Sequence, residues 1–443
     1  MTPRIPGPAR RRKPHERRLP PEPASIEKDR AHARLAGKPL DRTAGGARGE
    51  KHAIVLKPGR EKSVQRRHPW VFSGAIETVH GEPAPGETVA VLAASGEVLA
   101  QAAYSPHSQI RARIWSFAAG VPIDAAFMTE RLRQALAYRR RVLPLSVDAC
   151  RLVHAECDGL PGLVVDRYAD TAVMQCSSAG AEYWRDVYAG ALVELGACAR
   201  VYERSDAEVR RLEGLEPRAQ PVIGDAPQDA IRVREGPLAF LVDVRHGQKT
   251  GLFIDQRDNR ARVRDAAAGR RVLDVFSYTG GFALAALAGG AAHVTAIETS
   301  AEAIAGAWAN AQASALDAST VRWIEEDAFA ALRRLAAAGE RFDLIVLDPP
   351  KFAPTERHVE RAARAYKDIN LWAFRLLRAG GTLHTFSCSG GVDAKLFQSI
   401  VAGAALDAGV QGRIVARLAA AADHPVALDF PEGEYLKGLV VAV

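Results

Sequence analysis

The feature that most constrains the fold of this chain is an apolar run that ends in two adjacent glycines. Residues 271–282 read Arg-Val-Leu-Asp-Val-Phe-Ser-Tyr-Thr-Gly-Gly-Phe. The run 272–276 predicts a buried strand, and the alanine-rich stretch from Phe282 predicts a helix. Gly280 and Gly281 predict a tight turn between them, because only a backbone without Cβ can turn this sharply and lie against a ligand. Strand, turn and helix in this order are typical of the first unit of a nucleotide-binding α/β sheet.

Two carboxylates indicate which kind of ligand this unit would take. The glycines do not form the dinucleotide pattern G-x-G-x-x-G, and Asp274 lies inside the strand, where it would repel a pyrophosphate. A cationic ligand is therefore expected. A second apolar strand over 293–297 ends in Glu298, about 24 residues after Asp274, where an acid is placed to bind ribose hydroxyls.

Strands and helices alternate through the C-terminal half of the chain. Strands are expected at 272–276, 293–297, 321–324, 343–347 and 381–386. Such alternation predicts a parallel sheet with right-handed crossovers, completed by 413–418 and 438–443. In front of this sheet we expect a hairpin over 239–244 and 252–254, followed by a helix over 255–268.

The residues that close the strands are candidate ligand contacts, because ligands of an open parallel sheet bind beyond the carboxyl ends of its strands. The candidates are Asp274, Phe276, Ser277, Gly280, Gly281, Glu298, Asp327, Asp348 and Cys388, with Gln256 at the start of the preceding helix. Four acids and a thiol at the ends of successive elements are hard to explain by packing alone.

The length of the chain indicates how many domains it has, and the distribution of charge sets its N-terminal tail apart. At 443 residues, 48% of them hydrophobic, two or three domains are expected. The net charge of +7 comes from one end, since residues 1–51 hold 14 Lys and Arg against six Asp and Glu, whereas the remainder holds 45 against 46. This proline-rich tail is predicted to be disordered, either as a solvated tail or as a non-specific phosphate tether.

The sequence also argues against several classes of protein. No apolar run reaches the length of a membrane span and no hydrophobic segment stands at the N-terminus, so a cytoplasmic protein is expected. Five cysteines without a C-x-x-C pair argue against a zinc site and a disulfide framework. We therefore expect reduced thiols and no metal.

Residues 53 to 117 contain short β segments separated by Gly, Pro and Ser, which predict a small all-β barrel. The expected strands are 53–56, 70–72, 88–92, 98–104 and 111–115. Alternation favours Trp70 and Phe72 in the barrel core, which leaves Arg66 and Arg67 as the expected phosphate contacts. The stretch resembles a PUA domain, the small barrel found on many RNA-modifying enzymes.

The region between the barrel and the sheet predicts a small central α+β domain. Its expected elements are a helix over 123–141, a hairpin over 152–153 and 163–166, strands over 171–176 and 200–203, and a helix over 181–195. The expected division of the chain is a tail at 1–51, the barrel at 52–120, the central domain at 121–230 and the sheet domain at 231–443.

Motifs at two neighbouring strand ends carry the expected chemistry. In Asp348-Pro-Pro-Lys351 the prolines remove two amide donors, which leaves carbonyl oxygens and the Asp348 carboxylate to accept hydrogen bonds from a base amino group. Cys388 follows the next strand, between serines and glycines. A thiolate there suits a pyrimidine, because addition of sulfur at C6 makes C5 nucleophilic enough to take a methyl group.

These motifs, in the order Phe276-Ser-Tyr-Thr-Gly-Gly-Phe282, Asp348-Pro-Pro-Lys351 and Ser387-Cys-Ser-Gly390, resemble those of class I S-adenosylmethionine-dependent methyltransferases. More narrowly, the chain from about Ala53 to its end is similar to the bacterial ribosomal RNA large subunit methyltransferase I family. The resemblance implies an α/β protein with a PUA barrel, a central α+β domain and a class I (Rossmann-like) sheet. It also implies transfer of a methyl group from S-adenosyl-L-methionine to C5 of a cytosine in 23S rRNA.

The resemblance implies roles for the matching residues. Asp274 to Gly281 would line the methionine end of the cofactor, Glu298 would bind the ribose and Asp327 the adenine amino group, with Gln256 nearby. Asp348 would meet the target base, and Cys388 would be the nucleophile. Lys351 joins Arg66 and Arg67 as an expected RNA contact.

The acceptor of the C5 proton stays open. Many related 5-methylcytosine enzymes carry a second cysteine at the corner where this chain has Pro349 and Pro350. Asp348, Glu432, Glu434 or water could take the proton, and the sequence does not choose.

Two other functions and the oligomeric state also stay open. Methylation of an exocyclic amine of adenine or guanine uses an Asp-Pro-Pro corner usually followed by an aromatic residue; here Lys351 follows, with Phe352 one later, and such chemistry needs no Cys388. A non-catalytic RNA-binding assembly factor would not need the acids and the thiol together. A homodimer is neither required nor excluded.

Overall fold

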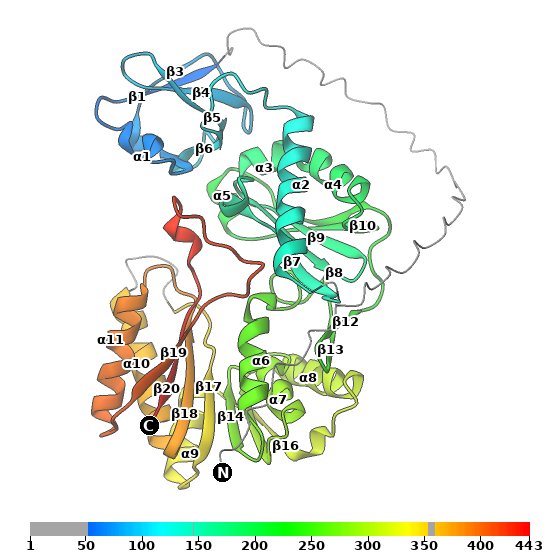
Figure 1. The fold of residues 1–443 in the computed structure, drawn as a ribbon, viewed down its shortest axis with the longest axis vertical. Helices are drawn as coiled ribbons and strands as arrows, with labels where there is room; N and C mark the ends of the chain where they lie inside the picture. The colour runs from blue at the N-terminus through cyan, green and yellow to red at the C-terminus, as the bar shows by residue number, and fades with distance from the viewer. Residues whose placement is uncertain (1–51, 145, 353–358) are drawn as a thin grey trace, which may run out of the picture. The chain divides into compact units, whose positions relative to one another are not determined.

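The computed structural model describes residues 52–144, 146–352 and 359–443 (Figure 1). All of them lie within one compact unit, Gly45–Val443. The basic tail predicted at 1–51 lies outside the described residues.

The N-terminal part forms a six-stranded sheet in the order β2-β6-β5-β4-β1-β3. Its elements are β1 (Ala53–Leu56), α1 (Lys62–Gln65), β2 (Trp70–Phe72), β3 (Ile76–His80), β4 (Thr88–Leu92), β5 (Val98–Tyr104) and β6 (Ile110–Ser116). The five predicted strands are confirmed. Strand β3 was missed because four of its five side chains are exposed, so it lacks an apolar alternation.

The predicted orientation of β2 is wrong. Val71 is 2% exposed and faces the barrel core, whereas Phe72 is 49% exposed. Trp70 instead packs outside the core, with its ring centroid 4.8 Å from that of Phe430. Local alternation failed here because the partner of Trp70 comes from the far end of the chain.

The central part is a five-stranded sheet in the order β11-β10-β9-β8-β7. Its elements are α2 (Ala125–Val142), β7 (Ala149–His154), β8 (Leu163–Tyr168), β9 (Thr171–Cys176), α3 (Ala179–Tyr183), α4 (Arg185–Glu194), β10 (Arg200–Ser205), α5 (Val209–Leu212) and β11 (Arg218–Ile223). The helix predicted over 181–195 is two helices that meet at Trp184. The exposed strand β11 was not predicted.

The hairpin predicted over 239–244 and 252–254 is wrong. Strand β13 (Leu238–Val242) pairs with the preceding β12 (Ile231–Glu235), through a turn in which Gly236 has φ +59°. After β13, the Asp243 carboxylate accepts hydrogen bonds from the backbone N–H groups of Arg245 and His246 and starts an irregular loop. The chain then enters the 3-10 turn Ile254–Gln256 (η3) and helix α6 (Arg257–Ala266).

The C-terminal sheet has seven strands in the order β16-β15-β14-β17-β18-β20-β19. They are β14 (Arg271–Val275), β15 (His293–Glu298), β16 (Val321–Glu325), β17 (Phe342–Leu347), β18 (Leu377–Ser387), β19 (Arg413–Leu418) and β20 (Lys437–Ala442). The first five in this order are parallel, and β20 runs antiparallel to both neighbours. The expected parallel sheet is confirmed, and strand order reverses between β14 and β17, where α/β sheets place their ligands.

Helices cover both faces of this sheet (Figure 1). The remaining helices are α7 (Gly281–Ala288), α8 (Ala301–Ala313), α9 (Ala328–Ala337), α10 (Val359–Leu376) and α11 (Ala394–Asp407). One apolar core packs α9, α10 and α11 against the sheet, and a second packs α6 and α7 against its other face. The carboxyl ends of β14, β15, β17 and β18 therefore open at one edge.

Candidate active site

The turn after β14 is held in an unusual backbone conformation. Phe276, Tyr278 and Gly280 have φ of 66°, 47° and 81°. The N–H groups of Phe276 and Ser277 both donate to the carbonyl of Ile297, at 3.0 Å. Two non-glycine residues in the left-handed region are typical of a loop shaped for a ligand. Glycine at 280 also serves packing, because a Cβ there would lie 3.0 Å from the Ala307 Cβ.

Asp274 is fully buried beneath this turn. Its Oδ2 accepts a hydrogen bond from the backbone N–H of Ala283, at 2.8 Å, in the first turn of α7. Its Oδ1 is buried with no hydrogen-bond partner among the described residues. Burial raises the pKa of Asp274 to about 8. An orphaned carboxylate oxygen in a closed site fits a cationic group, which would restore the charge that burial suppresses.

Glu298 is fixed at the end of β15. Its Oε2 accepts from the N–H of Tyr278 at 2.8 Å, and its Oε1 accepts from the N–H groups of Thr299 and Ser300 at 2.8 and 3.1 Å. The carboxylate is thus tied to the turn after β14. The Thr299 hydroxyl also donates to Oε1, at 3.2 Å, whereas Oε2 accepts one hydrogen bond among the described residues and keeps a lone pair that a ribose hydroxyl could use.

Asp327 has a structural role that the sequence analysis missed. It is exposed and caps α9, with Oδ1 accepting from the N–H of Ala330 at 3.1 Å. Asp is a favoured residue at such a position, so capping alone accounts for it. Its expected contact with adenine stays a prediction.

Asp348 closes β17 beside the turn. Its backbone N–H donates to the carbonyl of Val275, the last residue of β14, at 3.4 Å. Burial and the nearby Asp255 carboxylate raise the pKa of Asp348 to about 7, and the neighbouring Gln256 amide and Lys249 oppose them. Gln256 was predicted at the cofactor, and the structure places its buried side chain at Asp348.

Cys388 lies next to the Asp348 corner. Its Sγ is 3.9 Å from the carbonyl oxygen of Pro349. Burial and the Asp348 carboxylate raise the pKa of the thiol, while Lys249 and Lys351 oppose them. The structure therefore brings the predicted nucleophile and the predicted base contact together, with the thiol protonated at rest.

Asp255 is a further candidate, at the start of the helix predicted over 255–268. It is 7% exposed, its Oδ2 accepts from the Tyr435 hydroxyl at 2.6 Å, and its Oδ1 has no partner among the described residues. Although burial acts in the opposite direction, Lys249 and His424 hold the pKa of Asp255 below its usual value. Beside Asp348, whose pKa is raised, the site thus holds a second carboxylate, Asp255, whose pKa is lowered and which stays ionised.

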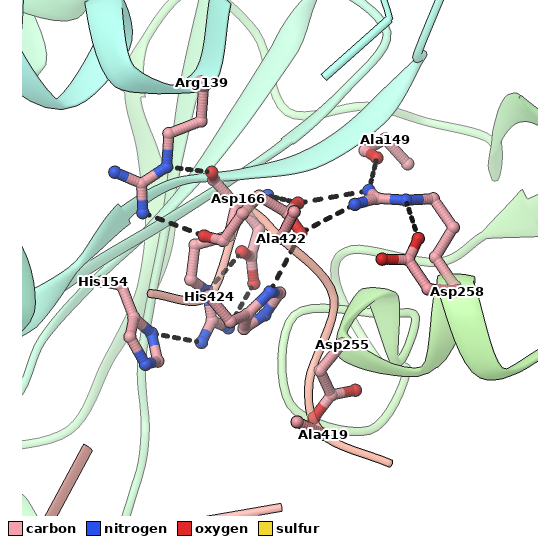
Figure 2. A network of polar contacts seen from close by, with 12 residues as sticks. Arg139, Ala149, His154, Asp166, Asp255, Asp258, Ala419, Ala422 and His424 are labelled. Carbon is pink, nitrogen blue, oxygen red and sulfur yellow. Dashed lines mark hydrogen bonds and ion pairs between the residues drawn. The ribbon is translucent and has the colours of Figure 1, made fainter. Parts of the chain in front are cut away.

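A buried polar network lies near Asp255 (Figure 2). Asp423 accepts two hydrogen bonds from Arg257, at 2.8 and 3.2 Å, and its Oδ1 lies 3.1 Å from Nδ1 of His424. Asp423 also accepts from the N–H of Arg151 in β7, at 2.9 Å. The loop before β20 is thereby fixed to the central sheet and to α6, which carries η3 and Asp255.

The predicted RNA contacts lie on the surface. Arg66, Arg67 and Lys351 are exposed, and none of them forms an ion pair with another described residue. Glu432, a candidate for the C5 proton, lies 3.3 Å from His68 of the barrel.

All five cysteines carry free thiols. Within residues 52–144, 146–352 and 359–443, no cluster of His, Cys, Asp and Glu is arranged for a metal ion. Among the same residues, no helix has the length and apolar character needed to cross a membrane.

Two family models match the chain. The model for S-adenosylmethionine-dependent methyltransferases matches residues 217–429, and the model for PUA-like domains matches residues 54–117. These matches confirm the expected fold class, with a PUA-like domain before a methyltransferase sheet.

Curated relatives extend the likeness over most of the chain. Proteins named ribosomal RNA large subunit methyltransferase I from Cronobacter sakazakii and Klebsiella pneumoniae are each 46% identical over 391 residues, which is 88% of this chain and 99% and 98% of theirs. Among solved structures, a protein of Streptococcus mutans assigned as a SAM-dependent methyltransferase superposes with a TM-score of 0.76 at 19% identity, covering 88% of this chain and all of that one. A further structure, a complex with SAH, gives a TM-score of 0.77 at 19% identity over the same shares.

Proposed function

Because the chain belongs to the ribosomal RNA large subunit methyltransferase I family, we propose that it methylates C5 of a cytosine in 23S rRNA through a covalent adduct with Cys388. The coarser assignment, an S-adenosylmethionine-dependent rRNA methyltransferase, follows from the family. The finer one rests on a single observation, which is that the Cys388 thiol lies against the Pro349 carbonyl at the Asp348 corner.

The residues at the sheet edge fit the cofactor. Asp274 would face its cationic methionine end, Glu298 would accept from its ribose hydroxyls, and the turn 276–281 would line it. When bound, S-adenosylmethionine supplies an electrophilic methyl group to C5 of the target base. The protein must supply the nucleophile, the proton donor and the proton acceptor.

Cys388 and Asp348 would act together in the first step. The Cys388 sulfur, having lost its proton, adds to C6 of the cytosine, and a proton from Asp348 reaches N3 so that the ring does not accumulate negative charge. With a pKa of about 7, Asp348 is substantially protonated at neutral pH and can act as this donor.

Asp255 would act in the last step. After methylation, C5 carries both the methyl group and its original proton. A carboxylate that stays ionised can remove this proton; the electron pair re-forms the C5–C6 double bond, the C6–sulfur bond breaks and N3 returns its proton to Asp348. Two carboxylates whose pKa values are pushed apart provide this division between acid and base.

Methylation of an exocyclic amine gains no support from the site. An aromatic residue after Asp-Pro-Pro serves that chemistry by stacking on the base. Here the Phe352 ring packs into the core, with its centroid 4.9 Å from that of Tyr366 and 6.4 Å from that of Phe276. The Phe352 ring therefore packs against other side chains and is not free to stack on a target base.

The proposal is tested by mapping modified nucleotides in 23S rRNA by mass spectrometry. Cells lacking this gene would be complemented with the wild type, with Cys388→Ala or with Cys198→Ala as a matched cysteine control. We expect one 5-methylcytosine in the wild type and the control, and none with Cys388→Ala. A methyl group on an exocyclic amine, or full methylation by Cys388→Ala, would contradict the proposal.

A further inference from the structure

Lys437 is a buried lysine beside the candidate nucleophile. It is the first residue of β20 and pairs with Ser387, the last residue of β18. Its Nζ donates to the carbonyl of Ser389 at 2.9 Å, and the residue is only 6% exposed. The amine therefore lies along the segment Ser387–Ser389, whose middle residue is Cys388.

Among the described residues, no carboxylate forms an ion pair with Lys437. No Asp or Glu oxygen of the described residues lies within ion-pair distance of its Nζ, and its one hydrogen bond in that part of the chain goes to a neutral carbonyl. Burial lowers the pKa of Lys437, and Cys388 is the strongest of the neighbours that favour its charged form, ahead of Glu434 and Asp393. An unpaired buried ammonium is costly, and a thiolate next to it would remove that cost.

Other charged groups also face Cys388, but they are less suited to this role. Asp348 and Asp255 oppose ionisation of the thiol, whereas Lys249 and Lys351 favour it. Both of these lysines are exposed, so water screens their charges. Of Lys249, Lys351 and Lys437, only Lys437 is buried.

We propose that Lys437 is the positioning residue that activates Cys388, taking the proton from its sulfur and remaining beside the thiolate as an ammonium ion. The S–H bond breaks, an N–H bond forms and the electron pair stays on sulfur. When the adduct is released, the proton returns to sulfur. The inference deepens the proposed function, since it assumes that Cys388 reacts as a thiolate.

The test is the pH dependence of Cys388 alkylation by iodoacetamide, measured by mass spectrometry of its peptide in the absence of RNA. Compared with the wild type, Lys437→Gln should raise the thiol pKa by about one unit and slow alkylation about tenfold near neutral pH. The exposed Lys395→Gln should leave the profile unchanged. Cofactor affinity and circular dichroism would establish that each variant is folded.

If Lys437→Gln folds and the pH dependence of Cys388 alkylation is unchanged, the inference is overturned. Lys437 would then have only a structural role, through its hydrogen bond to the Ser389 carbonyl. If Lys437→Gln does not fold, the same alkylation measurement on Lys437→Arg tests the inference. A permanent cation there should keep the thiol pKa at or below the wild-type value, and a clearly higher value would refute the pairing. Thiol reactivity is measured without substrate, so failure here is distinguishable from failure of the proposed methylation.

Discussion

Replacing Asp274 with Asn should stabilise the protein while weakening cofactor binding. The carboxyl has a pKa of about 8 in the folded protein, against 3.8 for an unperturbed Asp. Below pH 3.8 both the folded and the unfolded chain hold the proton, so Asp274 costs no stability. As pH rises from 3.8 to about 8, the unfolded chain has lost the proton and the folded chain must keep it, so stability falls. Above that window the penalty is constant.

The size of the effect follows from the same values. At pH 7, about three pH units above 3.8, the penalty has an upper limit of about 4 kcal/mol. The Asp274→Asn side chain has the same shape, and its oxygen can still accept from the Ala283 N–H. After relaxation of the site we expect a gain of about 1–3 kcal/mol at pH 7 and none at pH 3.8 or below.

The assay is denaturant unfolding at neutral and acidic pH, paired with calorimetry of cofactor binding. The exposed helix cap Asp327, changed to Asn, is the matched control and should show no such pH-dependent gain. Cofactor affinity of Asp274→Asn should fall at least about tenfold, because a neutral amide replaces the carboxylate. A variant that is no more stable than the wild type at pH 7 would refute the argument that Asp274 is held under a burial penalty.

Three further results are expected. Glu298→Gln should weaken cofactor binding about 10- to 100-fold and leave RNA affinity unchanged, because only the carboxylate at the end of β15 would meet the ribose; calorimetry and filter binding would separate the two. Asp255→Asn should accumulate a methylated RNA–protein adduct that survives denaturing gels, since the C5 proton cannot leave; rapid turnover without adduct would exclude Asp255 as the acceptor. Changing Arg66 and Arg67 together to Ala should lower RNA affinity. The slope of log affinity against log salt concentration should fall by the equivalent of about one or two phosphate contacts, and an unchanged slope would show that the two arginines do not contact the RNA.

The arrangement of the sheet could be predicted from the sequence. Buried parallel strands are continuous apolar runs, and their carboxyl ends meet at one edge, so Asp274, Glu298, Asp348 and Cys388 could be placed near one another without coordinates. The structure confirms the sheet and brings Asp348 and Cys388 together.

Contacts between distant segments could not be predicted. Lys437 lies beside Cys388 only because β20 returns antiparallel to β18. Asp255 accepts a hydrogen bond from Tyr435, which stands 180 positions later in the sequence. Trp70 lies outside the barrel core, where it packs against Phe430. Local periodicity carries no information on such pairs, and it also misplaced the hairpin before η3.

The most direct test of the central claim is capture of the adduct on RNA that contains 5-fluorocytidine. Fluorine replaces the C5 proton and cannot leave as a cation, so elimination is blocked after sulfur addition and methylation. We predict a denaturation-resistant complex whose digestion yields a peptide with Cys388 joined to a methylated fluorocytosine, formed only with S-adenosylmethionine present. Efficient methylation of the normal RNA without such a complex, or attachment at another residue, would contradict the account.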